Sequence, residues 1–459
     1  MSCRSWARLG AVGTASFVAR LDALPLNRFH WRLLVTSGLG WMFDAMDVIL
    51  VAFLLRPIGV EFALDPQRAG ILGAATPAGM FLGAALSGRL ADRYGRKAIF
   101  QITLIVFSAG TVLSAAAPTY ETLLLARIIA GIGLGGELPV VATLVSEFSP
   151  RASRGRMIVL LESFWAYGTI VAGLIAVFVV PSFGWRGAFL VGALPALYIA
   201  YLRRALPESP RYLAARGMLN EADAVVRTVK REGGAALITV ARLVAPPPAP
   251  KVGLGDLWAP AFARRTLMLW ILWFGIVFTY YGIFLWAPTI LAARGMTVQR
   301  SNEFFFLSTL AQVPGYFSAA WLVERWGRKP TLVTYLIGTA ISAFFFGNAG
   351  TDVAAFIWIS LLSFFNLGAW GVIYTLSPEM YPTSIRATGA GAAASIGRIG
   401  GIIGPFLTPV LVPIWGQTGV FVLFMMLLLV TALNVFVLAE ETKGRSLEEL
   451  GEARVVAAP

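Results

Sequence analysis

Two acidic residues stand where apolar side chains are expected. The stretch GWMFDAMDVILVAFLL (residues 40–55) is apolar enough to lie in lipid, yet it contains Asp44 and Asp47 three residues apart. On a helix, this spacing places both side chains on one face. An ionised carboxylate at bilayer depth costs several kcal/mol unless it faces a partner or a water-filled path. Both acids therefore need a partner or a path.

The composition is that of a polytopic membrane protein. Of 459 residues, 58% are hydrophobic and 13% charged, and the mean hydropathy is +0.74, whereas an ordinary soluble domain carries about 25% charged residues. A single cysteine, Cys3, excludes a disulfide framework, and a single histidine, His30, excludes a His-rich metal site. There is also no Ser-His-Asp set or metal cluster. We therefore expect neither an enzyme nor a bound metal or cofactor.

Apolar runs of roughly twenty residues, enough to cross the hydrocarbon core, recur twelve times. The first six lie near residues 31–55, 68–90, 98–117, 122–147, 157–180 and 186–204. After a polar stretch the other six lie near residues 266–291, 303–323, 331–349, 352–377, 388–413 and 417–438. The sequence thus predicts an all-α membrane protein with twelve transmembrane helices.

The basic residues are distributed unevenly between the loops. Of 37 Lys and Arg, five fall in loops on one side and two inside spans, which leaves 30 on the side of the termini. The positive-inside rule then predicts a cell-membrane protein with both termini in the cytoplasm. The net charge of +13 follows from this topology, so we expect a lipid bilayer and no nucleic acid as a partner.

The two halves of the chain repeat each other. LADRYGRK (90–97) returns as LVERWGRK (322–329), SEFSPRASR (146–154) as SPEMYPTSIR (377–386), and LPES (206–209) as LAEE (438–441), always 232 residues on. Six spans followed by six, entered from the same side, predict two parallel repeats around a central cavity. The expected units are a tail (1–30), two six-helix bundles (31–204 and 265–438), a linker with short surface helices (205–264) and a second tail (439–459).

The repeated loops carry acids and bases at matching positions on the cytoplasmic side. Exposed ion pairs are worth only about 0–1 kcal/mol each, which suits a latch that must reopen better than a scaffold. The alternative is that these basic residues only anchor the topology. We expect a cytoplasmic gate formed by Asp92, Arg96, Glu147, Arg154 and Glu208 and by their second-half counterparts Glu324, Arg328, Glu379 and Arg386.

These motifs resemble those of the major facilitator superfamily. GRLADRYGRK is similar to its signature loop, and RIIAGIGLGGELP, PESPRYL and ETKGRSLEEL resemble its sugar-porter branch, although Ala439-Glu440 stands where that branch usually has Pro-Glu. FDAMD, GGELPVVATLVSEFSP and RGRMIVLLESFWAYG are similar to the bacterial niacin transporters, a proton-coupled group. The resemblance implies the major facilitator fold and transport driven by a proton gradient.

The resemblance also implies a coupling pair. Sugar porters pair an acid at the position of Asp47 with an arginine at that of Arg127, and this acid carries the transported proton. An acid beside an arginine stays ionised, and moving the arginine away favours its protonation. Asp44 could share this role or line the cytoplasmic half of the same path, and Glu137 could merely satisfy a neighbouring helix.

The expected substrate site differs from that of a sugar porter. Glu162 aligns with a glutamine that holds sugar hydroxyls in that branch, and the paired glutamines of the seventh span are replaced here by Gly275 and Ile276. Arg398 has no acid in its own span and offers a fork that fits a carboxylate. Aromatic residues in several spans suit a flat ring, and we expect Trp41, Trp165, Tyr280, Tyr281, Trp370 and Tyr374 to line the site.

The sequence therefore favours a proton-coupled importer of a small aromatic carboxylate, with nicotinate as the leading substrate and protons as the co-substrate. The alternatives are transport of another organic acid, of an organic cation drawn to the buried acids, or of a sugar. A further alternative is a non-transporting membrane sensor on the same scaffold. Nothing in the sequence demands an oligomer, so a monomer is expected.

Overall fold

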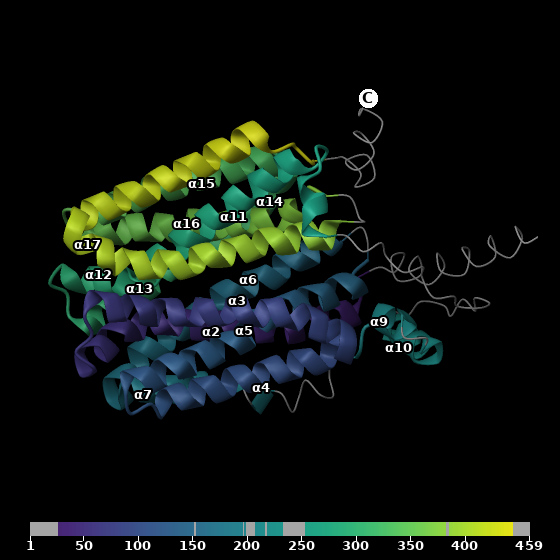
Figure 1. The fold of residues 1–459 in the computed structure, drawn as a ribbon, viewed down its shortest axis with the longest axis horizontal. Helices are drawn as coiled ribbons and strands as arrows, with labels where there is room; N and C mark the ends of the chain where they lie inside the picture. Colours follow the sequence, from purple (N-terminus) through teal and green to yellow (C-terminus); the bar gives the residue numbers. More distant parts are fainter. Residues whose placement is uncertain are drawn as a thin grey trace, which may run out of the picture.

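The structure is a computed structural model that describes residues 26–150, 153–195, 197–198, 207–215, 218–232, 253–381 and 385–443. The described residues form helices joined by short turns. Figure 1 shows two groups of long helices lying side by side, one from each half of the chain. Helices α9 and α10 of the linker project from one end of the bundle. We call this the linker end, and the opposite end the far end.

The first half contains six spans, and polar caps begin several of them. Asn27, Asp65 and Thr119 each accept a hydrogen bond from a backbone N–H in the first turn of the helix that follows, which satisfies donors that have no partner within a helix. The first bundle begins at Arg28 rather than at residue 31 because Asn27 provides this cap. The helices are α2 (Arg28–Glu61), α3 (Pro66–Tyr94), α4 (Arg96–Ala115), α5 (Tyr120–Phe148), α6 (Arg154–Phe178) and α7 (Val180–Gly192).

The second half repeats this order with two broken spans. The seventh span divides between α11 and α12, where Pro288 occupies the first turn of α12, and the eighth divides between α13 and α14. Breaks of this kind are common in transporter helices near a binding site. The helices are α11 (Ala263–Phe284), α12 (Ala287–Ala293), α13 (Val298–Thr309), α14 (Gln312–Arg325), α15 (Arg328–Gly347), α16 (Asp352–Glu379) and α17 (Arg386–Leu438). α17 comprises the last two spans, which join at Gly416.

The backbone confirms the duplication that the motifs predict. Gly95 and Gly327, 232 residues apart, have φ of 102° and 104° and lie just before α4 and α15. Gly184 and Gly416, also 232 residues apart, have φ of 64° and 68° and separate the fifth from the sixth span of each half. Residues with a side chain rarely adopt these angles, so glycine is required at the same four turns.

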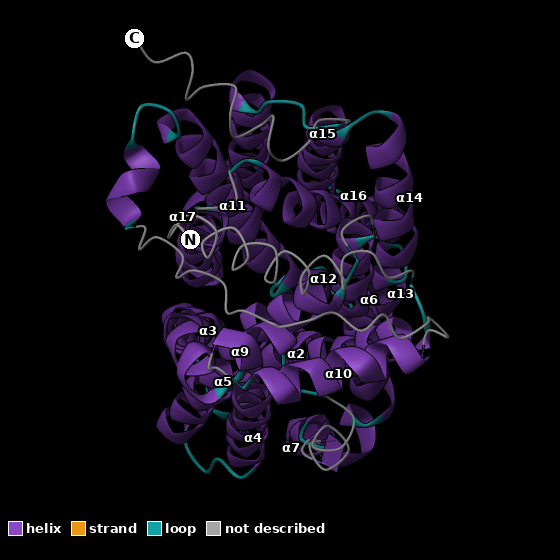
Figure 2. Ribbon diagram, turned by 90° about the vertical axis from the view of Figure 1, so that its right-hand side faces the viewer, coloured by secondary structure: helices purple, strands orange, loops and turns teal. Residues whose placement is uncertain are grey.

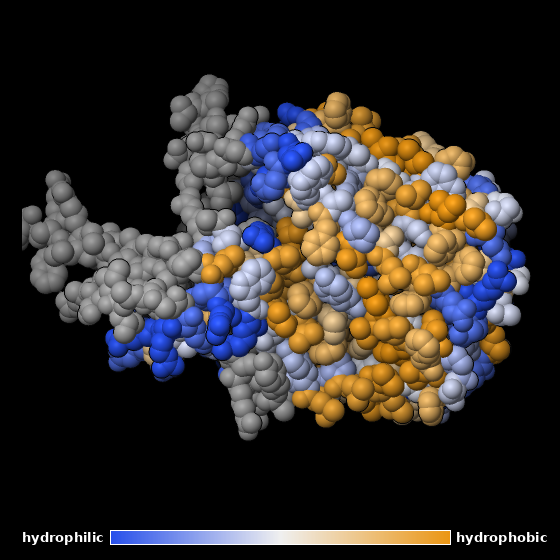
Figure 3. All heavy atoms as spheres, turned by 180° about the vertical axis from the view of Figure 1, so that it is seen from behind, coloured by the Kyte–Doolittle hydropathy of each residue, from blue (hydrophilic) through white to orange (hydrophobic). Residues whose placement is uncertain are grey.

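The surface and the helix lengths fit a bilayer. Eight of the described helices are long and apolar enough to cross a membrane. Counting α17 as two crossings and including α5, α7 and the α13–α14 pair gives the twelve predicted spans. In Figure 3 apolar side chains cover the middle of the visible face, and polar side chains gather toward its two ends. This is the pattern of a protein surrounded by lipid tails.

The two halves make close contact at the far end. A Cβ on Gly70 of α3 would lie 2.8 Å from the carbonyl oxygen of Phe406 in α17, so the backbones of opposite halves touch there. Phe53 of α2 also packs on Phe305 of α13, with ring centroids 5.1 Å apart. Seen from the linker end, the halves form separate upper and lower groups of helices (Figure 2).

The linker helices α9 (Pro210–Ala215) and α10 (Leu219–Glu232) lie against the first half, and a 3-10 turn, η1 (Leu254–Trp258), precedes α11. The side chain of Asn27 donates a hydrogen bond to the carbonyl of Val229, 3.0 Å away. Arg32 forms an ion pair with Glu232 at 2.8 Å. α10 is thereby fixed to the beginning of α2.

Candidate functional site

The structure brings Asp47 and Arg127 together in a buried ion pair. Both residues are fully buried, and the guanidinium binds both carboxylate oxygens of Asp47 through its two Nη atoms. The Thr111 hydroxyl donates a further hydrogen bond to Asp47, 2.9 Å away, and Arg127 Nε donates one to Thr76, 3.2 Å away. The guanidinium also lies 5.1 Å from the ring centroid of Phe189. Residues of five helices, α2 to α5 and α7, thus hold one compensated pair of charges.

Asp44 does not join this pair. It lies one turn closer to the linker end of α2, is fully buried, and faces Glu137 of α5. Tyr281 of α11 is a further neighbour of Asp44. The two acids that share one face of α2 therefore have different environments: a cation neutralises Asp47, whereas Asp44 is placed beside another carboxyl group.

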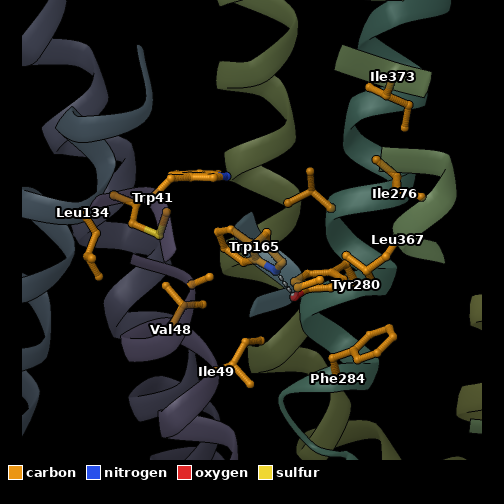
Figure 4. Packing of buried hydrophobic residues seen from close by; sticks show 14 of the residues in the cluster. Trp41, Val48, Ile49, Leu134, Trp165, Ile276, Tyr280, Phe284, Leu367 and Ile373 are labelled. Carbon is orange, nitrogen blue, oxygen red and sulfur yellow. Dashed lines mark hydrogen bonds between the residues drawn. The ribbon is translucent and has the colours of Figure 1, made fainter. Parts of the chain in front are cut away.

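The six predicted aromatic residues lie in one cluster that spans both halves. Trp41 of α2 and Trp165 of α6 have ring centroids 5.0 Å apart. The indole nitrogen of Trp165 donates a 2.7 Å hydrogen bond to the hydroxyl of Tyr280 in α11. Figure 4 shows this hydrogen bond at the centre of the packing between the halves. It is a direct polar link between the two bundles.

The cluster continues through the second half. Tyr280 lies 5.3 Å from Tyr281 and 6.0 Å from Trp370, and Trp370 stacks on Tyr374 at 5.7 Å between ring centroids. Trp273 of α11 contacts Trp370 and Tyr374 edge-on at 5.7 and 5.3 Å. Aromatic faces from α2, α6, α11 and α16 therefore form a continuous apolar lining.

Two charged residues reach this lining from opposite halves. Glu162 of α6 is 1% exposed and lies beside Trp41, Tyr316 and Tyr374. Within the described part of the chain, its Oε1 atom has no hydrogen-bond partner. A buried polar atom without a partner costs about 1–3 kcal/mol, so this oxygen is suited to receive a hydrogen bond from a ligand.

Arg398 of α17 approaches the same aromatic residues from the second half. Its guanidinium lies near Tyr281 and Tyr374, and its Nε atom is buried without an acceptor among the described residues. No carboxylate of the described chain pairs with it, in contrast with Arg127. Tyr374 neighbours both Glu162 and Arg398, so an acid and a base from opposite halves share one aromatic site.

At the linker end, acids of the first half hold the turn before α4. Glu208 accepts hydrogen bonds from the backbone nitrogens of Lys97 (3.3 Å) and Ser209 (2.9 Å). The Ser209 hydroxyl in turn donates to Glu147. A Cβ on Gly95 would collide with the Glu208 carboxylate. The carboxylate thus satisfies a free N–H group at the beginning of a helix.

The second half repeats this arrangement. Glu441 accepts hydrogen bonds from the backbone nitrogens of Arg328 and Lys329, both 3.0 Å away. The Thr442 hydroxyl donates to Glu379, and the guanidinium of Arg328 forms an ion pair with Glu379 at 3.2 Å. Each of these contacts links helices of the same half.

This repeat corrects one motif alignment. The matching of LPES with LAEE places Glu440 opposite Glu208, but the structure gives the role of Glu208 to Glu441. Glu440 instead forms an ion pair with Arg265 at 2.8 Å. The chain takes one more residue after α17 before it reaches the first turn of α15, so the sequence offset at this motif is 233 rather than 232.

The other predicted gate residues make fewer defined contacts. Glu324 is exposed, and Arg386 donates a hydrogen bond to the carbonyl of Tyr381, 3.3 Å away. The side chains of Asp92, Arg96 and Arg154 lie outside the described residues.

Sequence reasoning did not anticipate Trp273, Tyr316 or Thr111. Trp273 and Tyr316 looked like ordinary membrane aromatics, and Thr111 lies in an apolar span without a motif. Their spans are predictable, but which way each side chain faces depends on how the helices pack. In the described chain no group of three or more His, Cys, Asp or Glu residues could hold a metal ion.

Comparison with known proteins places this geometry in context. The family model described as "Sugar (and other) transporter" matches residues 61–453. The niacin transporter NiaP of Acinetobacter baylyi is 49% identical over 95% of this chain and 99% of its own length. A NiaP protein of Bacillus subtilis is 46% identical over 91% of this chain and 98% of its own length.

The fold is similar to that of solved transporters. The xylose transporter XylE from E. coli, in a partially occluded inward-open conformation, superposes with a TM-score of 0.75 at 17% identity, covering 91% of this chain and 99% of XylE. At this identity the likeness concerns the fold alone. It agrees with the two six-helix bundles and with the contacts between them at the far end.

Proposed function

The chain belongs to the sugar (and other) transporter family, and on this premise we propose that it is a proton-coupled importer of nicotinate or a closely related aromatic carboxylate. The observation that carries the proposal is Arg398, a buried arginine without an acid partner in the described chain, set among aromatic rings. The relative from A. baylyi, described as a niacin transporter, supports the choice of substrate.

A carboxylate would bind Arg398 through the two parallel N–H groups of the guanidinium. The site contains a second requirement, because Glu162 approaches the same aromatic residues from the first half. Two like charges would repel, so an anion needs a group that satisfies this acid. The ring nitrogen of nicotinate, in its protonated form, can donate a hydrogen bond to Glu162. Benzoate has the carboxylate without this nitrogen and should bind less tightly.

The aromatic rings supply the apolar walls of the proposed site. Trp41 and Trp165 come from the first half, and Tyr281, Trp370 and Tyr374 from the second. A planar ring can stack between such faces. A sugar needs many neutral donors and acceptors instead, and the aromatic lining offers few of them. The geometry thus supports a flat carboxylate over a sugar.

The proposed coupling uses the ion pair of Asp47 and Arg127. The pair is bidentate and fully buried, so the carboxylate stays ionised while the guanidinium is in place. Movement of α5 relative to α2 would separate the charges and favour protonation of Asp47. Proton occupancy would then change with conformation, as symport requires. Import follows when the linker end faces the cytoplasm of a cell membrane.

The acid networks at the linker end support a role in this movement. Contacts of Glu147 and Glu379 hold the turns of each half together, and with the halves joined at the far end the chain would be open toward the cytoplasm. We propose that these networks rearrange to form the gate when the outside opens. Glu379→Gln should raise the labelling of a cysteine placed on the cytoplasmic part of α11, and unchanged labelling would leave the network a purely structural role.

Uptake into proteoliposomes tests the proposal directly. Purified protein would be reconstituted with an imposed pH gradient and given labelled nicotinate, nicotinamide, benzoate or glucose. We expect nicotinate over benzoate, both well above glucose, and more uptake as the external pH falls. Preferred uptake of glucose or of a quaternary ammonium would contradict the proposed substrate. Equal uptake with and without the gradient would contradict proton coupling.

Arg398→Ala separates recognition of the carboxylate from general damage to the site. A hydrogen bond to a charged group is worth about 1.5–3 kcal/mol, which corresponds to roughly ten- to hundredfold weaker binding of nicotinate. Neutral nicotinamide should lose much less. Arg398→Lys keeps the charge without the fork and should fall between the two. Equal losses for the acid and the amide would assign Arg398 a structural role.

A further inference from the structure

A second pair of buried carboxyl groups lies apart from the ion pair of Asp47 and Arg127. Asp44 of α2 and Glu137 of α5 are both fully buried, and their carboxyl groups face and interact with each other. Within the described chain, none of their four oxygens has a hydrogen-bond donor. An ionised carboxylate can only accept hydrogen bonds, so two such groups cannot satisfy each other.

The backbone is shaped to hold Glu137 in this place. Glu137 Oε1 lies where a Cβ on Gly40 of α2 would lie, and the ring of Phe100 of α4 adjoins the same point. Any side chain at residue 40 would displace the carboxyl group. Gly40 lies one turn before Asp44 on the same helix, so the glycine admits the acid of α5 to the face of α2 that carries the aspartate.

The neighbouring charged and titratable groups do not neutralise the pair. On α2 the nearest is Asp47, whose charge is balanced by Arg127 of α5. From α11, Tyr281 lies near Asp44, and α4 contributes the uncharged Phe100. Two adjacent buried carboxylates with no cation or donor would each cost several kcal/mol of desolvation and would repel each other as well.

The missing partner must therefore be a cation small enough for the space between two carboxyl groups. The described chain places no third acid or histidine with them in a metal-binding group. A proton needs only two oxygens: bound to one carboxyl group, it makes this group a donor to the other. It thereby removes a negative charge and supplies the absent hydrogen bond.

We propose that Asp44 and Glu137 form a proton-binding site, separate from Asp47 and Arg127, that holds at least one proton in this conformation. The proton comes from water and bonds to one carboxylate oxygen, and on release it returns to water and leaves two carboxylates. Because loss of the proton restores repulsion between α2 and α5, occupancy of the site is coupled to how these helices pack. The inference goes beyond the proposed function, since it holds for any substrate.

Infrared spectroscopy of the purified protein without substrate tests the site. A protonated carboxyl group has a C=O stretching band that is distinct from that of a carboxylate and shifts in D2O. We expect such a band in the wild-type protein near neutral pH, and its loss or shift in both Asp44→Asn and Glu137→Gln. Glu162→Gln, which alters another buried acid, is the matched control and should leave the component assigned to the pair unchanged.

Gly40→Ala provides a variant that keeps both acids. The added methyl group should push the Glu137 carboxyl away from Asp44, so we expect the band to shift while the protonated group persists. A band that is unchanged in Asp44→Asn and Glu137→Gln, or absent from the wild type, would overturn the proposal. So would an unshifted band in Gly40→Ala. Because no substrate is used, failure of nicotinate uptake and failure of this inference remain distinguishable.

Discussion

Replacing Asp47 with asparagine removes a negative charge from a fully buried site and keeps the volume of the side chain. The guanidinium of Arg127 then keeps Thr76 and one amide oxygen as acceptors but loses its counter-charge. Removing one partner of a buried ion pair typically costs about 3–5 kcal/mol. Asparagine still accepts a hydrogen bond, so we expect a loss of about 3 kcal/mol in the free energy of unfolding.

The reverse variant and the double variant show whether this cost comes from the unpaired charge. Arg127→Met leaves Asp47 with the Thr111 hydroxyl as its donor among the described contacts, and we expect a loss of about 3–5 kcal/mol. With both substitutions no charge remains, and replacement of a whole buried pair by neutral side chains is often close to neutral. The double variant should therefore be no less stable than the single variants.

The assay is equilibrium unfolding in mixed detergent micelles, followed by tryptophan fluorescence. The double-mutant cycle should give a coupling energy of about 3 kcal/mol, at the upper end of the usual range. In proteoliposomes, Asp47→Asn should abolish accumulation against a substrate gradient but retain exchange at equal pH, since an amide cannot carry the proton. Additive stability losses would refute the electrostatic reasoning. Accumulation that persists with pH as the only driving force would refute the coupling role.

Three further predictions follow from single contacts. Tyr280→Phe removes the hydrogen bond to Trp165 and should cost about 0.5–1.5 kcal/mol in the free energy of unfolding; a loss below the error of the unfolding assay would show that the link is not stabilising. Glu441→Gln should destabilise the protein by about 0.5–2 kcal/mol through the lost helix cap, while Glu324→Gln, at an exposed position, should change it by less than about 0.5 kcal/mol. Gly70→Leu should prevent the halves from closing at the far end and increase labelling of a cysteine introduced there, and unchanged labelling would contradict the close contact.

The contacts at the turn after the last span illustrate where prediction from sequence stopped. The repeated glycines Gly95 and Gly327 could be matched from the motif alone, because a turn with positive φ leaves glycine at a fixed distance from the motif. The acids that bind beside them could not, since Glu440 and Glu441 are adjacent and chemically identical. Only the path of the chain after α17 decides which of them reaches the free N–H groups of α15.

The sequence by itself determined the spans, the duplication and the types of residue available for chemistry. Apolar runs and loop charges reflect the bilayer as solvent, which acts on each segment separately. The tertiary structure decided the partners. Asp44 and Asp47 share a helix face and look equivalent in sequence, yet one meets Arg127 and the other meets Glu137. That difference arises because α2 and α5 cross at one particular register, and Gly40 admits a side chain from α5 beside Asp44.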